Sequence, residues 1–105
     1  MFARVTIVEV DPVRMSPEAA VAQFKELVLP ELHNQPGYEG VYVLDTPEGK
    51  GLLISLWATR EAAQSNVASG YYEAQLAKFV TVFRSPPGRE QYEVAFAESP
   101  SGTAP

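Results

Sequence analysis

The spacing of hydrophobic positions changes several times along the chain, and each change predicts a new element. Residues 2–10, FARVTIVEV, are rich in β-branched side chains and predict a strand. Ser16 followed by Pro17 is typical of a helix start. The apolar side chains that follow have helical spacing on one face, at Ala20, Val21, Phe24, Leu27 and Val28. Pro30 lacks an amide donor, so we expect it to kink this helix or end its regular part.

The rest of the chain repeats the alternation of strand and helix patterns. Residues 38–45 and 51–57 predict two strands, and TPEGKG between them predicts a hairpin connection. Thr59 is placed to cap a following helix, and Gly70 should interrupt it before a second helical segment, YYEAQLAKFVTVF. Residues 91–97, QYEVAFA, alternate in polarity and predict a fourth strand.

The resulting order is strand, helix, strand, strand, helix, strand, which is that of the split βαβ or ferredoxin-like fold. We therefore predict one α+β domain over residues 1–97, with an antiparallel four-stranded sheet and both helices on one face. Residues 98–105 are rich in Ser, Pro and Gly and predict a flexible C-terminal tail.

Both faces of the predicted sheet are largely apolar. Within each predicted strand, apolar side chains point to both sides. The first strand divides Val5 and Ile7 from Phe2, Val8 and Val10; the second divides Tyr38, Tyr42 and Leu44 from Val41 and Val43; the third divides Leu52, Ile54 and Leu56 from Leu53, Ser55 and Trp57. Helices cover one face only, and each large apolar side chain left in water forgoes about 1.5–3 kcal/mol. We therefore expect a homodimer with its sheets packed face to face; the alternative is that a loop or the tail folds over the second face.

Composition narrows the class of partner. The chain of 105 residues has a net charge of −5, which argues against nucleic acid or an anionic membrane as partner. It has no cysteine and a single histidine, which argues against disulfides, thiolate chemistry and a metal site. Because no signal peptide or membrane-length apolar stretch is found, we expect a cytoplasmic protein.

Three stretches carry a resemblance to a known family: LPELHNQPGYEGVYVL at 29–44, LISLWATREAAQSNVAS at 53–69, and the YYEAQLAKF that follows. A helix–PGY–strand join, and a strand ending in Trp before a helix with Glu-Ala-Ala, resemble the antibiotic biosynthesis monooxygenase domains of the dimeric α/β-barrel superfamily. The resemblance runs from Phe2 to Ala97. It implies two protomers that form one α/β barrel.

The resemblance implies a cofactor-independent monooxygenase acting on a small aromatic substrate, such as a phenol, anthrone or quinol, in an apolar pocket. No flavin or metal is then required, because a deprotonated, electron-rich substrate itself reduces O₂. One alternative is a non-catalytic homodimer that binds a small aromatic or lipid-like ligand. Another is haem binding or degradation, but in that branch a His follows on the helix where Leu76 stands, and an Asn lies on the strand that here carries Arg4 and Thr6.

Aromatic residues are the first candidates for a site. Trp57 ends a strand on the same side as Ser55, so its indole is placed either to stack on a substrate and donate one N–H or to plug the core. Tyr72 shares a helical stripe with Leu76 and Phe79, and its phenol either orients a substrate oxygen or is a core aromatic. Tyr71 points about 100° away, so we expect only one of the two tyrosines to face inward.

His33 is the remaining catalytic candidate. It has the only side chain that ordinarily titrates near neutral pH, and suits a general base; the alternative is that it complements the dipole at a helix end. Asn66 is expected to be solvated on its helix, and Arg89 to be a loop charge. Arg4 is left open: buried, it would need an acidic partner or an anionic ligand, whereas at an edge it would be solvated.

Overall fold

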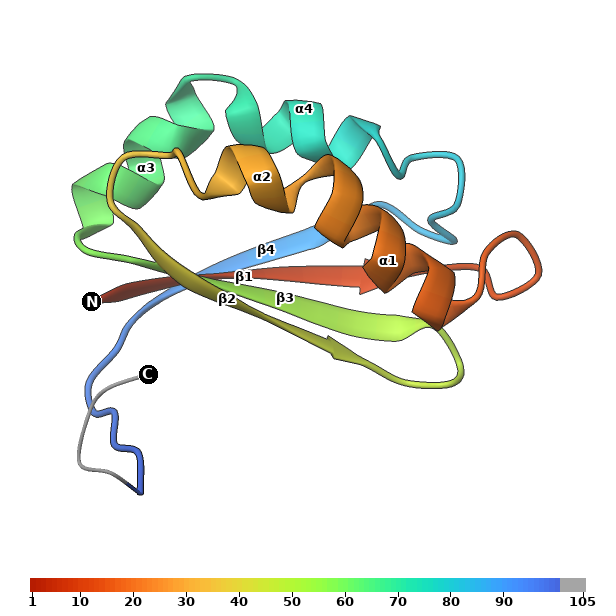
Figure 1. Ribbon diagram of the computed structural model, residues 1–105, viewed down its shortest axis with the longest axis horizontal. Helices are drawn as coiled ribbons and strands as arrows, with labels where there is room; N and C mark the ends of the chain where they lie inside the picture. Colours follow the sequence, from red (N-terminus) through yellow and green to blue (C-terminus); the bar gives the residue numbers. More distant parts are fainter. Residues whose placement is uncertain (101–105) are drawn as a thin grey trace.

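Four antiparallel strands form one sheet, and the helices cover one of its faces, in the computed structural model, which describes residues 1–100 (Figure 1). The strands are β1 (Phe2–Glu9), β2 (Tyr38–Asp45), β3 (Lys50–Trp57) and β4 (Gly88–Glu93). Their order across the sheet is β2-β3-β1-β4, so β1 and β3 lie at the centre. The predicted ferredoxin-like α+β fold is confirmed.

The helices are α1 (Pro17–Leu27), α2 (Leu29–Leu32), α3 (Arg60–Ala68) and α4 (Tyr71–Ala77). Two of them, α1 and α3, begin at a residue whose side chain caps the helix. The Ser16 hydroxyl accepts a hydrogen bond from the Ala19 amide at 3.1 Å, and Thr59 does the same for Ala62 at 3.0 Å. The helix is interrupted at Val28, between α1 and α2, and Pro30 lies in the first turn of α2, so the break expected near Pro30 is present.

Gly70 makes the junction between α3 and α4. Its φ of 87° lies in the left-handed region, which glycine adopts without steric cost. The turn sets α4 over the sheet beside α1 and α2 (Figure 1). It thereby places Tyr71 and Tyr72, the first two residues of α4, above the central strands.

The fourth strand differs from its prediction. It was expected at residues 91–97 but lies at Gly88–Glu93. The partner strand decides its limits: β1 pairs Ile7 with Gly88 and Phe2 with Glu93, and the last bond runs from the Val94 amide to the Met1 carbonyl at 2.9 Å. Of the predicted tail, residues 98–100 have no strand or helix, and residues 101–105 lie outside the described part of the chain.

Tyr38 was expected on the same face as Tyr42 and Leu44, and this was wrong. The pairing of β2 with β3 slips by one residue between Tyr38 and Gly40. A one-residue slip moves a side chain to the opposite face of a sheet. Tyr38 therefore packs under the helices, with its ring centroid 6.0 Å from that of Trp57.

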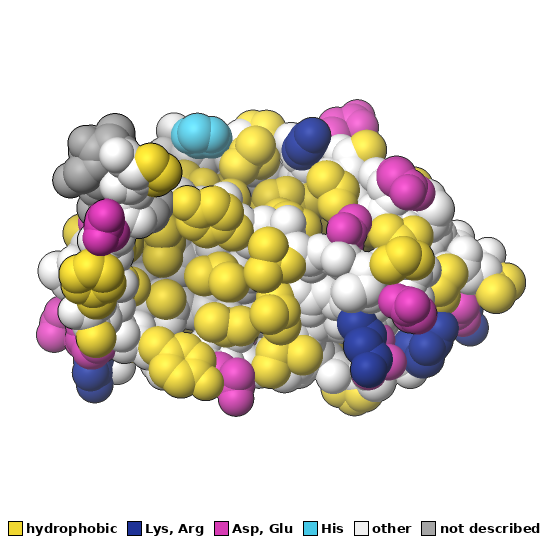
Figure 2. All heavy atoms as spheres, turned by 90° about the horizontal axis from the view of Figure 1, so that it is seen from below, with side chains coloured by type: hydrophobic (Ala, Val, Ile, Leu, Met, Phe, Trp, Pro, Cys, Tyr) yellow, Lys and Arg dark blue, Asp and Glu magenta, His cyan; other side chains and the backbone are white. Residues whose placement is uncertain are grey.

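The face of the sheet away from the helices is largely apolar, as predicted (Figure 2). Its outward side chains include Ile7, Tyr42, Leu44 and Tyr92, which are 37%, 48%, 48% and 53% exposed. Val5, Leu52 and Ile54 lie between them on the central strands and are half-buried. We call this surface the open face. Across residues 1–100, no helix combines the length and apolarity needed to cross a bilayer.

Candidate functional site

A cavity of about 130 Å³ lies between the helices and the sheet. Its walls are mainly aliphatic and aromatic side chains, among them Val21, Phe24, Val41, Leu53, Leu76 and Phe79. Polar side chains also line it: Arg4, Thr6, Ser55, Tyr71 and Tyr72 are buried or half-buried, Gln75 is half-buried, and Asp45 and Lys50 are exposed. The cavity is thus an apolar chamber with a few polar groups, the usual composition of a small-ligand site.

The two central strands place three of the buried polar groups, Arg4, Thr6 and Ser55, together at one end of the cavity. Arg4 pairs with Ser55 across the β1–β3 ladder, and Thr6 is the next residue of β1 on that face. Val8 and Val10 follow further along β1 and are apolar. The end beside Arg4 therefore holds the buried polar groups, and we call it the polar end. The opposite end lies beside Val8 and Val10, with the exposed Asp45 and Lys50 at its edge.

Arg4 is the charged group of the polar end. It is only 4% exposed, and its Nη1 donates to Asn66 Oδ1 at 2.9 Å. Asn66 Nδ2 in turn donates to Gln35 Oε1 at 2.9 Å, so the network joins β1, α3 and the segment before β2. The guanidinium carbon lies 4.9 Å from the ring centroid of Trp57 and 4.4 Å from that of Tyr72. Such contacts between a cation and aromatic faces are attractive.

Burial lowers the pKa of Arg4 to about 10. Tyr72 and Tyr71 oppose the shift, whereas the like charge of Arg89 adds to it. The Arg89 guanidinium carbon is 5.3 Å from the Tyr72 ring centroid. Arg4 thus remains a cation at neutral pH, although its surroundings disfavour the charge.

Tyr71 and Tyr72 both line the cavity, so the expectation that only one faces inward was wrong. The cavity has two walls at this point: the Tyr72 hydroxyl is 2.8 Å from Thr6 Oγ1 on the sheet, while Tyr71 packs against the core cluster to which α1 and α2 contribute. The Tyr71 hydroxyl is buried and has no hydrogen-bond partner among residues 1–100. Its pKa is raised to about 12, first by burial, then by Glu31, with Arg4 opposing and Tyr38 adding.

Trp57 lies beneath the polar end and does not line the cavity. It is fully buried in the core with Phe2 and Phe24, and its Nε1 donates to Ser55 Oγ at 2.9 Å. Arg4 occupies one face of its ring. In the structure, the indole therefore packs in the core and contacts Ser55 and Arg4. A catalytic role for Trp57 stays a prediction.

His33 lies away from the cavity. It is exposed at the C-terminal end of α2, where its ring contacts Tyr38 edge-on at a centroid distance of 5.8 Å. The structure thus brings Ser55 and Tyr72 together with Arg4 and Thr6, and separates them from His33. The proposed role of His33 as a general base stays a prediction.

Two residues differ from their expected surroundings. Asn66 was expected to be solvated but is 5% exposed beside Arg4, and Arg89 was expected in a loop but lies in β4. Asn66 lies one helical turn after Ala63, which is buried, and this spacing was the sequence feature that could have placed Asn66 on the core side of the helix. Arg4 is two residues from Phe2 on β1, so the two side chains share one face of the strand, and this spacing could have shown that Arg4 faces the core.

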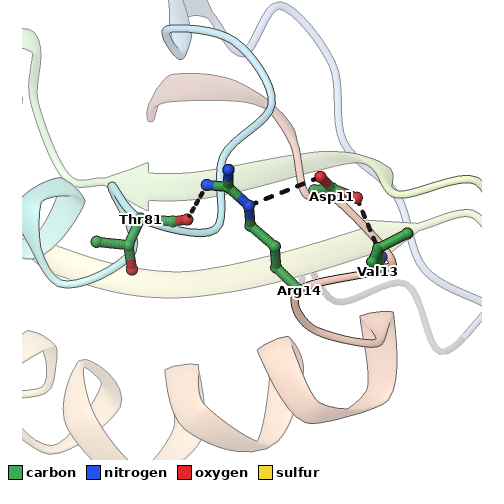
Figure 3. Close-up of polar contacts among 4 residues, drawn as sticks. All are labelled: Asp11, Val13, Arg14 and Thr81. Atoms are coloured by element: carbon green, nitrogen blue, oxygen red, sulfur yellow. Dashed lines mark hydrogen bonds and ion pairs between the residues drawn. The ribbon is translucent and has the colours of Figure 1, made fainter.

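The loop after β1 is held against residues 81–84 by side-chain contacts of Asp11 and Arg14 (Figure 3). Asp11 Oδ1 accepts from the Val13 amide at 3.0 Å, and Asp11 Oδ2 lies 3.8 Å from Arg14 Nε. Arg14 Nη1 donates to the Thr81 carbonyl at 2.7 Å. These contacts hold the loop against residues 81–84, so that Val10 and Phe83 stay in the cavity wall.

No group of three or more His, Cys, Asp or Glu residues within 1–100 is arranged to hold a metal ion. Fold and cavity define a ferredoxin-like α+β protein with a small-ligand chamber between its two layers. The profile of one family, described as antibiotic biosynthesis monooxygenase, matches residues 1–78. The chain belongs to this family.

Solved structures share the fold over nearly the whole chain. A protein of unknown function from Nitrosomonas europaea, NE2512, is 25% identical with a TM-score of 0.72, covering 96% of this chain and 95% of its own. The monooxygenase ActVA-Orf6 of Streptomyces coelicolor, solved with nanaomycin D, is 17% identical with a TM-score of 0.69, covering 94% and 91%. SnoaB, a cofactor-independent oxygenase from Streptomyces nogalater, is 11% identical with a TM-score of 0.71, covering 91% and 94%. Comparison with curated proteins gives no match.

Proposed function

We propose that the protein is a cofactor-independent monooxygenase that oxidises a small phenol, anthrone or quinol-like aromatic compound in the cavity beneath its helices. One observation carries the proposal: in a member of this family, an apolar chamber ends in buried polar side chains. An aromatic ring fits the apolar walls, and its oxygen substituent fits the polar end. The oxygenase SnoaB and the monooxygenase ActVA-Orf6 share the fold and support this reading.

The reaction needs little covalent chemistry from the protein. A deprotonated anthrone-type carbon reduces O₂ and combines with it; its CH₂ group becomes a carbonyl, and the second oxygen atom leaves as water. The walls exclude bulk water, and the polar end orients the reacting oxygen. In this proposal Tyr72 and Ser55 contact the substrate, and Trp57 holds Ser55 and Arg4 in place.

We further propose that the active form is a homodimer whose open faces pack together. The area of apolar side chains on that face supports this, because a soluble monomer seldom leaves such a patch in water (Figure 2). The cavity lies on the opposite side of the sheet from the open face. Each protomer would then keep its own cavity.

A second function, ligand binding without turnover, has one observation in its favour. No carboxylate or imidazole stands among the described side chains at the polar end; Asp45, which lines the cavity, lies beside Gly51, four residues along β3 from Ser55. The site therefore lacks an evident general base. In this reading the cavity stores or carries an aromatic compound.

Oxygen uptake distinguishes the two functions. The protein is incubated aerobically with a panel of anthrones and hydroquinones, and O₂ consumption is followed with an electrode. Ala20→Leu extends a side chain into the cavity from α1, whereas Ala22→Leu makes the same change on the exposed side of that helix. We expect uptake with the parent protein and Ala22→Leu, and a loss of at least about tenfold with Ala20→Leu. Ligand binding without uptake across the panel would establish the second function instead.

A further inference from the structure

We propose that the ligand of this cavity is a single-ring aromatic compound with an anionic oxygen, and that this oxygen pairs with Arg4. The inference rests on the proposed function in taking the cavity as the ligand site, and it goes further by naming the charge and size of the ligand. Four features of the described residues lead to it: an unpaired buried cation, its neutral neighbours, the local charge and the cavity volume.

Arg4 is a buried cation without a counter-ion. Its guanidinium carries five N–H donors, yet among residues 1–100 its side chain makes one hydrogen bond, to the neutral amide oxygen of Asn66. Its Nε is buried with no partner. Within the same residues, the ion pairs are Arg14–Asp11 and Arg60–Glu93, both at the surface. A buried charge is costly unless it is paired, so the unpaired donors favour an acceptor from outside the chain.

The neighbours of Arg4 do not replace that acceptor. The rings of Trp57 and Tyr72 attract the cation through their faces but leave its edge donors free. Tyr71 is a neutral phenol at neutral pH, as tyrosine ordinarily is, and burial, which raises its pKa to about 12, makes its ionisation harder still. No side chain near the guanidinium therefore supplies negative charge under ordinary conditions.

The polar end is also locally positive in a chain that is negative overall. The net charge of the sequence is −5, yet Arg4 and Arg89 both lie against the ring of Tyr72. Their like charges disfavour each other, and this contributes to the lowered pKa of Arg4. A bound anion would relieve both the repulsion and the burial of an unpaired charge. An uncharged aromatic ligand would relieve neither.

The volume limits the ligand to about one ring, so among the substrates proposed above it favours phenols and quinols over three-ring anthrones. A dry protein cavity of roughly 150 Å³ is known to hold benzene, and the cavity here is about 130 Å³. Leu53, Leu76 and Phe79 supply apolar walls for such a ring. With the ring against these walls, a carboxylate or phenolate at its edge reaches the polar end, where the free guanidinium donors lie.

Matched probes test the charge requirement. Benzoate and benzamide have nearly the same shape, but only benzoate is charged at neutral pH. Their affinities for the full chain are measured by calorimetry and by the fluorescence of Trp57, the chain's single tryptophan, whose ring lies 4.9 Å from the guanidinium carbon. We expect benzoate to bind at least about tenfold more tightly, as a charge-assisted pair requires. A 4-nitrophenolate arm, followed by its absorbance, shows whether a phenolate satisfies Arg4 as well as a carboxylate.

Three variants assign the effect to Arg4. Arg4→Gln should lower benzoate affinity to that of benzamide. Asn66→Asp supplies a carboxylate beside the intact guanidinium, so it should remove the preference for benzoate even if Arg4→Gln fails to fold. Arg60→Gln is the matched control, because Arg60 also lies over an aromatic ring, that of Phe2, but outside the cavity wall.

The inference is overturned if benzamide binds the parent protein as tightly as benzoate, if neither probe binds, or if the preference survives in Asn66→Asp. Its failure is separate from that of the monooxygenase proposal. Anion binding without O₂ uptake would support this inference and contradict the monooxygenase proposal. O₂ uptake with neutral substrates that is unchanged in Arg4→Gln would support the monooxygenase proposal and contradict this inference.

Discussion

Arg4 Nη1 and Asn66 Oδ1, 62 residues apart in the sequence, form a 2.9 Å hydrogen bond between the first strand and α3. Both side chains are buried, and the bond is the only one that the Arg4 side chain makes within residues 1–100. It therefore fixes the orientation of the guanidinium at the polar end of the cavity. It also makes the stability of the fold depend on a side chain that belongs to the site.

Replacing Asn66 with Ala should destabilise the protein by about 1–3 kcal/mol, because it leaves a buried charged donor without its acceptor. Urea unfolding followed by circular dichroism measures the change. Gln64→Ala is the control, since Gln64 is exposed on the same helix. Equal midpoints for the two variants would show that the bond contributes nothing to stability.

Trp57→Phe should cost about 1–3 kcal/mol, since it removes the hydrogen bond to Ser55 and leaves space in the core. The ring does not line the cavity but positions Ser55, and phenylalanine keeps an aromatic face for Arg4, so O₂ uptake per folded molecule should fall by no more than about tenfold. Stability is followed by circular dichroism, as the variant has no tryptophan. A fall in turnover of the folded variant well beyond this range would give the indole a part in catalysis.

The phenol of Tyr71 should ionise late in a pH titration. Its pKa is raised from 10.0 to about 12, so the folded state holds this proton more firmly than the unfolded state. The stability that this contributes is present below pH 10 and is lost as the pH rises toward 12. Tyrosinate absorbance of the folded protein should show a late-ionising phenol that disappears in Tyr71→Phe. An unchanged high-pH end of the curve in that variant would contradict the assignment.

The open face provides a test of assembly. Tyr42→Lys places a charge on that face, where a second protomer would have to bury it, so we expect the dimer to dissociate at least about tenfold more readily. Val13→Lys adds the same charge in the loop after β1, at a position 94% exposed. Sedimentation reports the mass against the 11.5 kDa of one chain. A parent protein that sediments as one chain at all concentrations would remove the homodimer from the proposal.

Gly70→Ala tests the junction that positions α4. An added Cβ meets nothing within 4 Å, so any loss reflects the backbone alone, whose φ is +87°. We expect about 1–2 kcal/mol of destabilisation, and less for Gly70→Asn, since Asn tolerates this conformation better. Thermal unfolding compares the two variants, and an alanine variant as stable as the parent would mean that the junction adopts another conformation.

Local sequence signals predicted the elements well and their pairing less well. Ser16 and Thr59 marked helix starts correctly because a cap involves only neighbouring residues. The face of Tyr38 could not be predicted, because the slip near Gly40 belongs to the ladder with β3. The range of the fourth strand was likewise decided by β1.

The candidate site was predicted in part for the same reason. Tyr72 lies in the cavity wall, and helical spacing with Leu76 pointed to it. The contact of Arg4 with Asn66 joins two elements whose relative placement no local pattern encodes. His33 showed the reverse: its titration range suggested chemistry, but only the fold could show that α2 carries it away from the cavity.

A single layer of backbone separates the chamber from the open face. Along β1, Arg4 and Thr6 point to one side, and Val5 and Ile7 to the other. In the proposed dimer, a second protomer on the outer surface of β1 and an anion at the guanidinium would act on the same strand. Any effect of one on the affinity of the other would then have to be reciprocal.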